Sequence, residues 1–450
     1  MSSTTTRDDA TSPAVPSSTD SRLERMGIPR TVAWGYLGVL LFMTGVGVDS
    51  NFITPHLVEA LGSPEATVAT IITAYSLTVL VGSYLSGALA DLIGPRRVML
   101  LGFAVWVVFQ AVFLLALDSG SFWFTAVSYA IRGFGYPLFA FGFLVWVNVA
   151  TRPERNGSAV GWFYVAFTGG LPTLGSLFAI GAIPTFGGGF AGETGAMWAS
   201  LLPVTLGFLV AWIGVRDPRG SRRIAPEGDS ASAVMLSGLA LTVRSPKVLM
   251  GFLVRLINTA PQYGMFIVLP AIIADDRGWG QARWLTMTVL VYATNIGVNA
   301  LFGWIGDRIG WQRTVKWFGV FGSSLGLLAW WYVPQLVPYG SDWGFWVATA
   351  AGCVFGCLLA GFVPMGAIMP ALAPERKGAA MAMYTTAAGG AAFLGSAVVA
   401  LGYAVGFGGQ GIVWMFVALY AAAFVMVGRL TVDQPGHPAP VPAPAVDAAR

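Results

Sequence analysis

Three charged side chains lie inside stretches of sequence that are otherwise apolar: Asp49, Arg132 and Arg255. Charges within a bilayer are costly, and they usually mark an ion pathway, a proton relay or a ligand site. Asp49 is the only acid well inside such a stretch. It is therefore the candidate proton acceptor, and Arg132 is its candidate partner.

The depths of Asp49 and Arg132 predict that their side chains meet. Asp49 lies 18 residues after position 31, where its apolar stretch begins, which is about 27 Å along a helix. Arg132 lies about 18 Å from the opposite end of its own helix, and the two depths sum to about 40–45 Å, the bilayer with its interfaces. The pair is either a permanent structural link or one that opens when Asp49 is protonated. We favour the second interpretation.

Polar side chains recur at helical spacing in two later stretches and form candidate ligand stripes. One stripe is Arg255, Asn258 and Gln262, and the other is Tyr292, Asn295 and Asn299. Amides that faced lipid would lack partners, so both stripes are expected to face the interior. Hydrogen bonding between helices without any ligand is the alternative. The remaining candidate ligand residues are Asn51, Tyr136, Tyr164, Thr168, Tyr263 and Tyr384.

These neutral amides and phenols suit a small, uncharged, polyhydroxylated ligand. They both donate and accept hydrogen bonds in place of water, and aromatic rings cover the C–H edges of such a molecule. Neither a nucleotide-binding loop nor a Cys/His cluster or Ser-His-Asp set is visible in the sequence. We therefore predict neither catalysis nor a cofactor or metal, and we expect a gradient to supply the energy.

The composition identifies the environment in which these residues act. The 450 residues are 56% apolar and only 10% charged, against about 25% charged in ordinary soluble domains. A soluble enzyme, a disordered protein and a nucleic-acid binder are excluded. Cys353 and Cys357 lie four residues apart in an apolar run, and we interpret them as packing residues rather than a disulfide.

Apolar stretches long enough to span a bilayer divide the chain into two sets of six. The sequence predicts an all-α integral membrane protein with disordered tails at 1–30 and 431–450, bundles at 31–215 and 247–430, and a polar linker at 216–246. The twelve predicted spans are 31–57, 67–90, 97–117, 121–150, 158–182, 195–215, 247–274, 283–305, 314–334, 343–370, 379–405 and 410–429.

Basic residues predict the orientation. With both termini in the cytoplasm, all but four of the 25 Lys and Arg fall in the tails and cytoplasmic loops; the exceptions are Arg132, Arg255, Arg277 and Arg283. This asymmetry follows the positive-inside rule. We expect a multi-pass monomer in the cell membrane, whose partners are the lipid bilayer, protons and the small ligand, and not nucleic acid.

The two halves are related in sequence. Gly87-x-x-x-Asp91-x-x-Gly94-x-Arg96-Arg97 is repeated as Gly303-x-x-x-Asp307-Arg308-x-Gly310-x-x-Arg313, with the aspartates 216 residues apart. Pro-Glu-Arg-x-Gly at 153–157 is repeated at 374–378, and Gly-Gly at 169–170 is repeated at 389–390. Three matches in the same order indicate a duplicated six-helix unit, which is typical of transporters that rock two halves about a central site.

The repeated loop resembles the signature of the major facilitator superfamily. The resemblance implies twelve transmembrane helices in two pseudo-symmetric six-helix bundles. It also implies that Asp91 and Asp307 latch the two halves on the cytoplasmic side, with Arg96, Arg97, Arg308 and Arg313 as their basic neighbours.

Several segments resemble the polyol permeases more narrowly, the ribitol and D-arabinitol proton symporters. They include Ile131-Arg-Gly-Phe-Gly-Tyr-Pro-Leu-Phe139, Val254-Arg-Leu-Ile-Asn-Thr259 and Gly361-Phe-Val-Pro-Met-Gly366. These permeases often carry two acids in the first helix, whereas the run from Gly45 to Asp49 keeps only the second. An acid–arginine pair is similar to that of proton-coupled sugar symporters.

Three functions are consistent with the sequence. We favour a proton-coupled importer of a sugar alcohol or related sugar. A drug or metabolite exporter of the same fold would carry an adjacent Gly-Pro motif in the fifth span, whereas Gly169-Gly-Leu-Pro172 separates the two residues. A non-transporting membrane sensor would carry a large added domain, and the tails are too short for one.

Overall fold

The computed structural model describes residues 21–50, 52–226, 228 and 230–436. Every regular element in these ranges is a helix. The first half contains α1 (Arg22–Arg25), α2 (Ala33–Val46), α3 (Ile53–Leu61), α4 (Glu65–Ile93), α5 (Pro95–Asp118), α6 (Phe122–Arg132), α7 (Gly135–Ala150), α8 (Asn156–Thr168), the π-helix η3 (Gly169–Leu174), α9 (Gly175–Thr185), α10 (Gly189–Ala199) and α11 (Leu201–Gly214).

The second half has the same general plan. It contains α13 (Pro246–Pro270), η5 (Ala271–Asp276), α14 (Gln281–Ile309), α15 (Trp311–Thr314), η6 (Val315–Gly322), α16 (Ser323–Leu336), α17 (Asp342–Leu359), η7 (Ala360–Phe362), α18 (Met365–Leu372), α19 (Lys377–Ala404) and α20 (Gly409–Arg429). Short 3-10 turns lie at η1 (Arg30–Val32), η2 (Pro153–Arg155), η4 (Pro218–Ser221) and η8 (Pro374–Arg376).

Ten helices in the described ranges are long and apolar enough to cross a membrane. Two of the twelve predicted spans, 31–57 and 314–334, are not among them. The first is divided into α2 and α3 by a break after Val46. The second is covered by α15, η6 and α16, where Trp, Gly and Ser residues lower the apolar character.

The linker differs from the expected polar loop because it contains a helix, α12 (Ala231–Arg244). Ser230 caps its N-terminus by accepting a hydrogen bond from the Ala233 amide, and Val234, Ser237 and Gly238 are buried. The Tyr84 hydroxyl of α4 donates to the Met235 carbonyl at 2.6 Å. A good cap explains where this helix begins, and the small residues Ser237 and Gly238 let it pack closely against α4 and α19.

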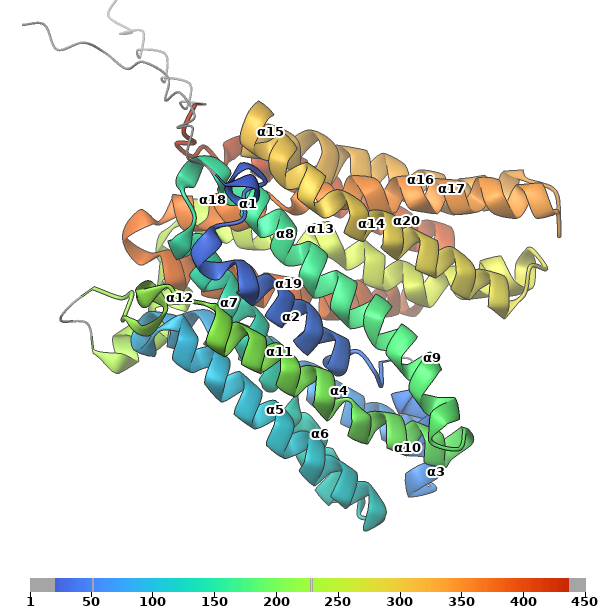
Figure 1. The fold of residues 1–450 in the computed structure, drawn as a ribbon. Helices are drawn as coiled ribbons and strands as arrows, with labels where there is room; N and C mark the ends of the chain where they lie inside the picture. The colour runs from blue at the N-terminus through green and yellow to red at the C-terminus, as the bar shows by residue number, and fades with distance from the viewer. Residues whose placement is uncertain (1–20, 51, 227, 229, 437–450) are drawn as a thin grey trace, which may run out of the picture.

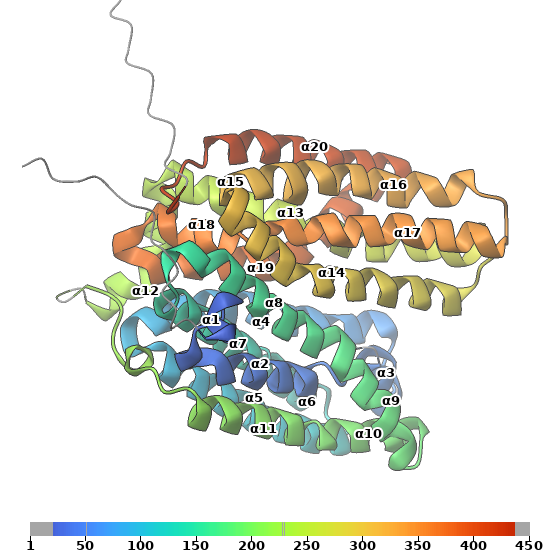
Figure 2. The same cartoon turned by 45° about the horizontal axis from the view of Figure 1, so that its top comes forward.

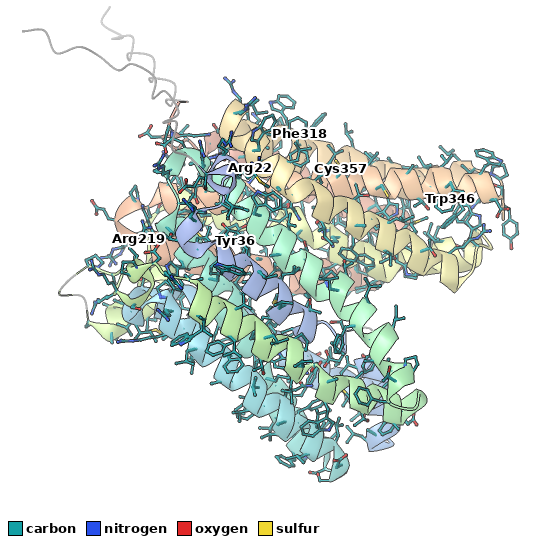
Figure 3. All side chains as sticks on the ribbon, viewed as in Figure 1. Arg22, Tyr36, Arg219, Phe318, Trp346 and Cys357 are labelled. Atoms are coloured by element: carbon teal, nitrogen blue, oxygen red, sulfur yellow. The ribbon has the colours of Figure 1, made fainter. Side chains whose placement is uncertain are left out.

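The two bundles lie one above the other, with α4, α8, α14 and α19 at their junction (Figure 2). We call the end of the molecule that carries α1, α12 and α18 the linker end. Figure 3 places Arg219 at this end and Trp346 at the opposite end. The far ends of α5, α6 and α10 diverge from those of α14 and α17 (Figure 1).

Close contacts between the halves gather toward the linker end, where glycines let the helices approach. A Cβ on Gly87 would lie 2.6 Å from the Ala382 backbone, and one on Gly303 would lie 2.4 Å from the Gly157 carbonyl oxygen. Small residues permit such close packing of membrane helices. Together with the diverging far ends, these contacts define a state that is closed at the linker end.

Candidate transport site and gates

The chain is broken where Asp49 lies. Residues 47–50 and 52, between α2 and α3, are in turns, and a Cβ on Gly47 would lie only 1.8 Å from the Leu171 carbonyl oxygen of η3. Irregular backbone at membrane depth is tolerated where it is buried in protein or lines a cavity. The break therefore holds Asp49 inside the bundle, against the π-helix η3 that contains Gly169-Gly-Leu-Pro172.

Asp49 and Arg132 form the predicted contact. An Arg132 guanidinium nitrogen lies 2.8 Å from the Asp49 carboxylate, and the side chains are only 1% and 7% exposed. Gln110 of α5 also accepts a hydrogen bond from Arg132, and the Tyr129 ring centroid lies 4.4 Å from its guanidinium carbon. The ion pair is confirmed as a contact. Its opening on protonation stays a prediction.

Arg255 lies at the junction of the two halves, surrounded by aromatic residues. Its guanidinium carbon lies 4.2 Å from the Phe362 ring centroid and 5.3 Å from that of Tyr384, and it donates to the Thr259 hydroxyl. The Tyr164 and Tyr384 hydroxyls, one from each half, are 2.8 Å apart, and the Arg255 guanidinium carbon lies 6.0 Å from the Tyr164 ring centroid. The structure thus brings together three predicted ligand residues from α8, α13 and α19.

A second group of predicted residues lies beside this cluster. Gln262 lies beside the Tyr292 hydroxyl, and Tyr292 stacks on Phe266 with ring centroids 5.3 Å apart. Tyr263 lies near Arg255 and Tyr164, and Tyr136 of the other half lies near Tyr263. Gln262, Tyr263, Tyr292 and Tyr136 all remain partly or largely exposed in this state, so their side chains are accessible.

The three asparagines of the two stripes face the interior as expected, but they do not join the accessible group around Gln262 and Tyr292. Asn258 is fully buried and donates to the Gly319 carbonyl of η6. Asn295 donates to the Gly356 carbonyl of α17 at 2.8 Å. Asn299 is fully buried, and its amide has no hydrogen-bond partner in the described part of the chain. Backbone carbonyls beside glycines satisfy the first two amides, which is the inter-helix alternative considered above.

Of the two remaining candidates, Thr168 bonds within its own helix and Asn51 stays a prediction. The Thr168 hydroxyl donates to the Tyr164 carbonyl of its own helix at 2.5 Å, so it is not held toward the other half. Asn51 lies outside the described residues.

Replacing Asn258 by alanine should lower stability without changing ligand affinity. The Gly319 carbonyl would lose its buried donor, which typically costs about 1–3 kcal/mol. Gln262→Ala should do the reverse, with affinity falling about 5- to 150-fold and the unfolding temperature unchanged. Binding titrations and thermal unfolding of both variants check this. A large affinity loss for Asn258→Ala would contradict the assignment.

Asp307 and Asp91 occupy equivalent positions across the junction of the halves. The Asp307 carboxylate accepts hydrogen bonds from the Gly157 amide at 3.0 Å, the Ser158 amide at 2.8 Å and the Ser158 hydroxyl at 2.6 Å. The Asp91 carboxylate lies beside the Ala379 amide and against Gly378, where a Cβ would be 1.7 Å from one of its oxygens. Each acid thus lies at a helix N-terminus of the opposite half, α8 or α19, where the helix dipole favours an anion.

The basic residues predicted beside these acids are placed elsewhere. Arg96 lies 4.4 Å from the Trp212 ring centroid and donates to the Trp212 carbonyl at 2.9 Å. Arg308 lies 4.2 Å from the Trp304 ring centroid, and Arg97 and Arg313 are exposed. These arginines place their charges on tryptophan rings or in solvent. At the junction itself, backbone amides already hold the Asp307 carboxylate.

Arg223 and Arg376 interact with Asp91 instead. Sequence reasoning did not select either residue as part of the gate. Arg376 lies in the repeated Pro-Glu-Arg-x-Gly motif, and this repeat could have identified it as a gate residue. Arg223 lies in the linker, where no motif indicates such a role.

The chain was compared with known proteins. The Major Facilitator Superfamily profile matches residues 35–365. The "Alpha-ketoglutarate permease" of Bacillus subtilis is 35% identical, with 92% of each chain covered. The "Ribitol transporter" of Klebsiella pneumoniae is 34% identical over 91% of this chain and 94% of the relative. The "D-arabinitol transporter" of the same organism is 33% identical over 91% and 95%.

Solved structures share the fold. A bacterial homologue of the iron transporter ferroportin in an outward-facing state has a TM-score of 0.69 at 14% identity, with 89% of this chain and 99% of that chain covered. The transporter FucP in the outward conformation has a TM-score of 0.67 at 11% identity, with the same coverage. At these identities the likeness shows the fold alone.

Proposed function

Because this chain belongs to the major facilitator superfamily of membrane transporters, we propose that it imports a sugar alcohol or a related sugar by proton-coupled alternating access. The buried Asp49–Arg132 ion pair carries the coupling part of this proposal. Protonation of Asp49 removes the charge that holds Arg132, so the break between α2 and α3 is released. The conformational change then depends on one bound proton.

The likeness to the ribitol and D-arabinitol transporters, over nine-tenths of the chain, supports the polyol part. The accessible groups Gln262, Tyr263, Tyr292 and Tyr136 are uncharged and both donate and accept hydrogen bonds. With the linker end in the cytoplasm, as the basic residues predict, the described state faces outward. A polyol would then enter from the opposite end and reach the junction of the halves above Arg255.

One observation favours a second candidate, an organic anion. Among the described residues, Arg255 interacts with hydroxyls and aromatic rings and forms no ion pair. A buried guanidinium without a carboxylate partner is a natural ligand for a substrate carboxylate. The relative named alpha-ketoglutarate permease is consistent with this alternative.

Counterflow in proteoliposomes distinguishes the two substrates. Vesicles loaded with ribitol, D-arabinitol, mannitol, xylose or 2-oxoglutarate would each be tested for exchange against the same labelled compound. We expect exchange of at least one polyol and none of 2-oxoglutarate, and we expect a pH gradient, acidic outside, to drive accumulation. Exchange of 2-oxoglutarate alone would overturn the polyol proposal. Extrusion driven by the same gradient would favour an exporter.

A further inference from the structure

Helices α2 and α11 pack side by side in the first bundle (Figures 1 and 2). A groove of about 630 Å³ runs along them, and its lining includes Arg30, Thr31, Trp34, Leu209, Ile213 and Arg216. This volume lies within the range of about 300–1,000 Å³ that is typical of small-ligand sites. Neither the transport site nor the gates use any of these residues.

The groove is amphipathic along its length. Trp34, Leu209 and Ile213 are 56%, 41% and 68% exposed, and they lie on spanning helices, so they face lipid. Arg30 and Arg216 lie at the linker end of the same two helices and are exposed. The Arg216 amide donates to the Thr31 carbonyl at 3.1 Å, which fixes the two chain segments beside each other. Charge at one end and apolar walls along the rest match an amphiphile.

A second pocket of about 210 Å³ shares Arg30 and Thr31 with the groove and extends the basic end. Arg152, Arg155 and Arg219 also line it, and Glu24 is the single acid among its lining residues. Asp217, next in sequence to Arg216, does not cancel the charge at the groove because it is paired with Arg219 at 2.7 Å. Burial alone would raise the pKa of the Asp217 carboxyl, but hydrogen bonds from Arg219 lower it below its ordinary value.

We propose that this groove is a binding site for an anionic glycerophospholipid. The phosphate and its headgroup lie between Arg30 and Arg216, and an acyl chain lies along Trp34, Leu209 and Ile213. Basic pockets between transmembrane helices at one membrane face bind anionic headgroups in this way. A free phosphate would contact the arginines but would leave the apolar walls at Trp34, Leu209 and Ile213 without a bound partner. The groove therefore favours the lipid.

Native mass spectrometry of the full-length protein, titrated with phosphatidylglycerol or with phosphatidylcholine, tests the proposal. Each basic residue near the surface strengthens the binding of anionic lipid about fivefold. The double variant Arg30→Gln/Arg216→Gln should therefore bind phosphatidylglycerol about 30-fold more weakly. Arg30→Lys/Arg216→Lys keeps both charges and should stay within about fivefold of the unmodified protein.

The matched control is Arg244→Gln/Arg429→Gln, which removes two exposed charges at the same end of the molecule, one at the end of the linker helix α12 and one at the end of α20. It should change phosphatidylglycerol binding less than about twofold. An equal loss in the control, or equal affinity for phosphatidylcholine and phosphatidylglycerol, would overturn the proposal. Displacement of phosphatidylglycerol by millimolar inorganic phosphate would also overturn it, because the site would then recognise phosphate without a lipid.

Discussion

Asp49→Asn should abolish uphill uptake while leaving counterflow within about threefold of the unmodified protein. An amide in place of the carboxylate keeps the size and one hydrogen-bond acceptor toward Arg132, but it neither binds nor releases a proton. Exchange needs no net proton movement, so it continues. Accumulation driven by a pH gradient and counterflow would be measured in the same proteoliposomes.

This experiment also separates a coupling role from a permanent structural pair. Breaking a buried ion pair by removing one partner typically costs about 3–5 kcal/mol, because the remaining charge is left uncompensated. If the pair only holds α2 and α3 against α6, Asp49→Asn should lower the unfolding temperature and impair uptake and counterflow together. The matched control is Asp118→Asn, which neutralises an exposed acid at the end of α5, away from the linker end. It should change neither uptake nor counterflow. Proton-driven accumulation by Asp49→Asn would refute the coupling role.

Sequence reasoning located the charged and aromatic residues at the junction because it relied on depth and on the cost of charge in lipid. Rise per residue placed Asp49 and Arg132 at compatible depths, and the structure confirms their contact. The internal repeat placed Asp91 and Asp307 in equivalent loops, and both lie against helix N-termini of the opposite half.

The amides show why the rest of the site was not predictable. The spacing of the polar residues predicts which face of its helix carries Asn258 or Asn295. It does not identify the helix that packs against that face. Glycines at 319 and 356 leave carbonyls open to an approaching amide, and no pattern within α13 or α14 reveals them. The break after Val46 was not predictable for the same reason. It depends on the close approach of Gly47 to Leu171, which lies in a distant segment of the chain.

Asp307→Ala should open the linker end. The variant loses three hydrogen bonds between the halves, from the Gly157 amide and from the Ser158 amide and hydroxyl. Allowing for partial replacement by water, this should cost the closed state about 2–4 kcal/mol, or about 30- to 700-fold in its population relative to the open state. Spin labels at Arg97 and Arg313, both exposed and in different halves, would report the separation by double electron–electron resonance. Asp433→Asn, an exposed acid near the same end, should leave it unchanged.

Gly378→Ala tests the equivalent contact of Asp91 without removing a charge. A Cβ on Gly378 would lie 1.7 Å from an Asp91 carboxylate oxygen, far inside any possible contact, so the Asp91 side chain must leave its place at the N-terminus of α19. Gly297→Ala is the matched control, because its Cβ would have nothing within 4 Å, and alanine there should slightly stabilise the helix. We expect Gly378→Ala to widen the linker end and slow turnover while ligand affinity stays within about threefold. If affinity is lost while the spin-label distance stays that of the unmodified protein, Asp91 does not latch the two halves.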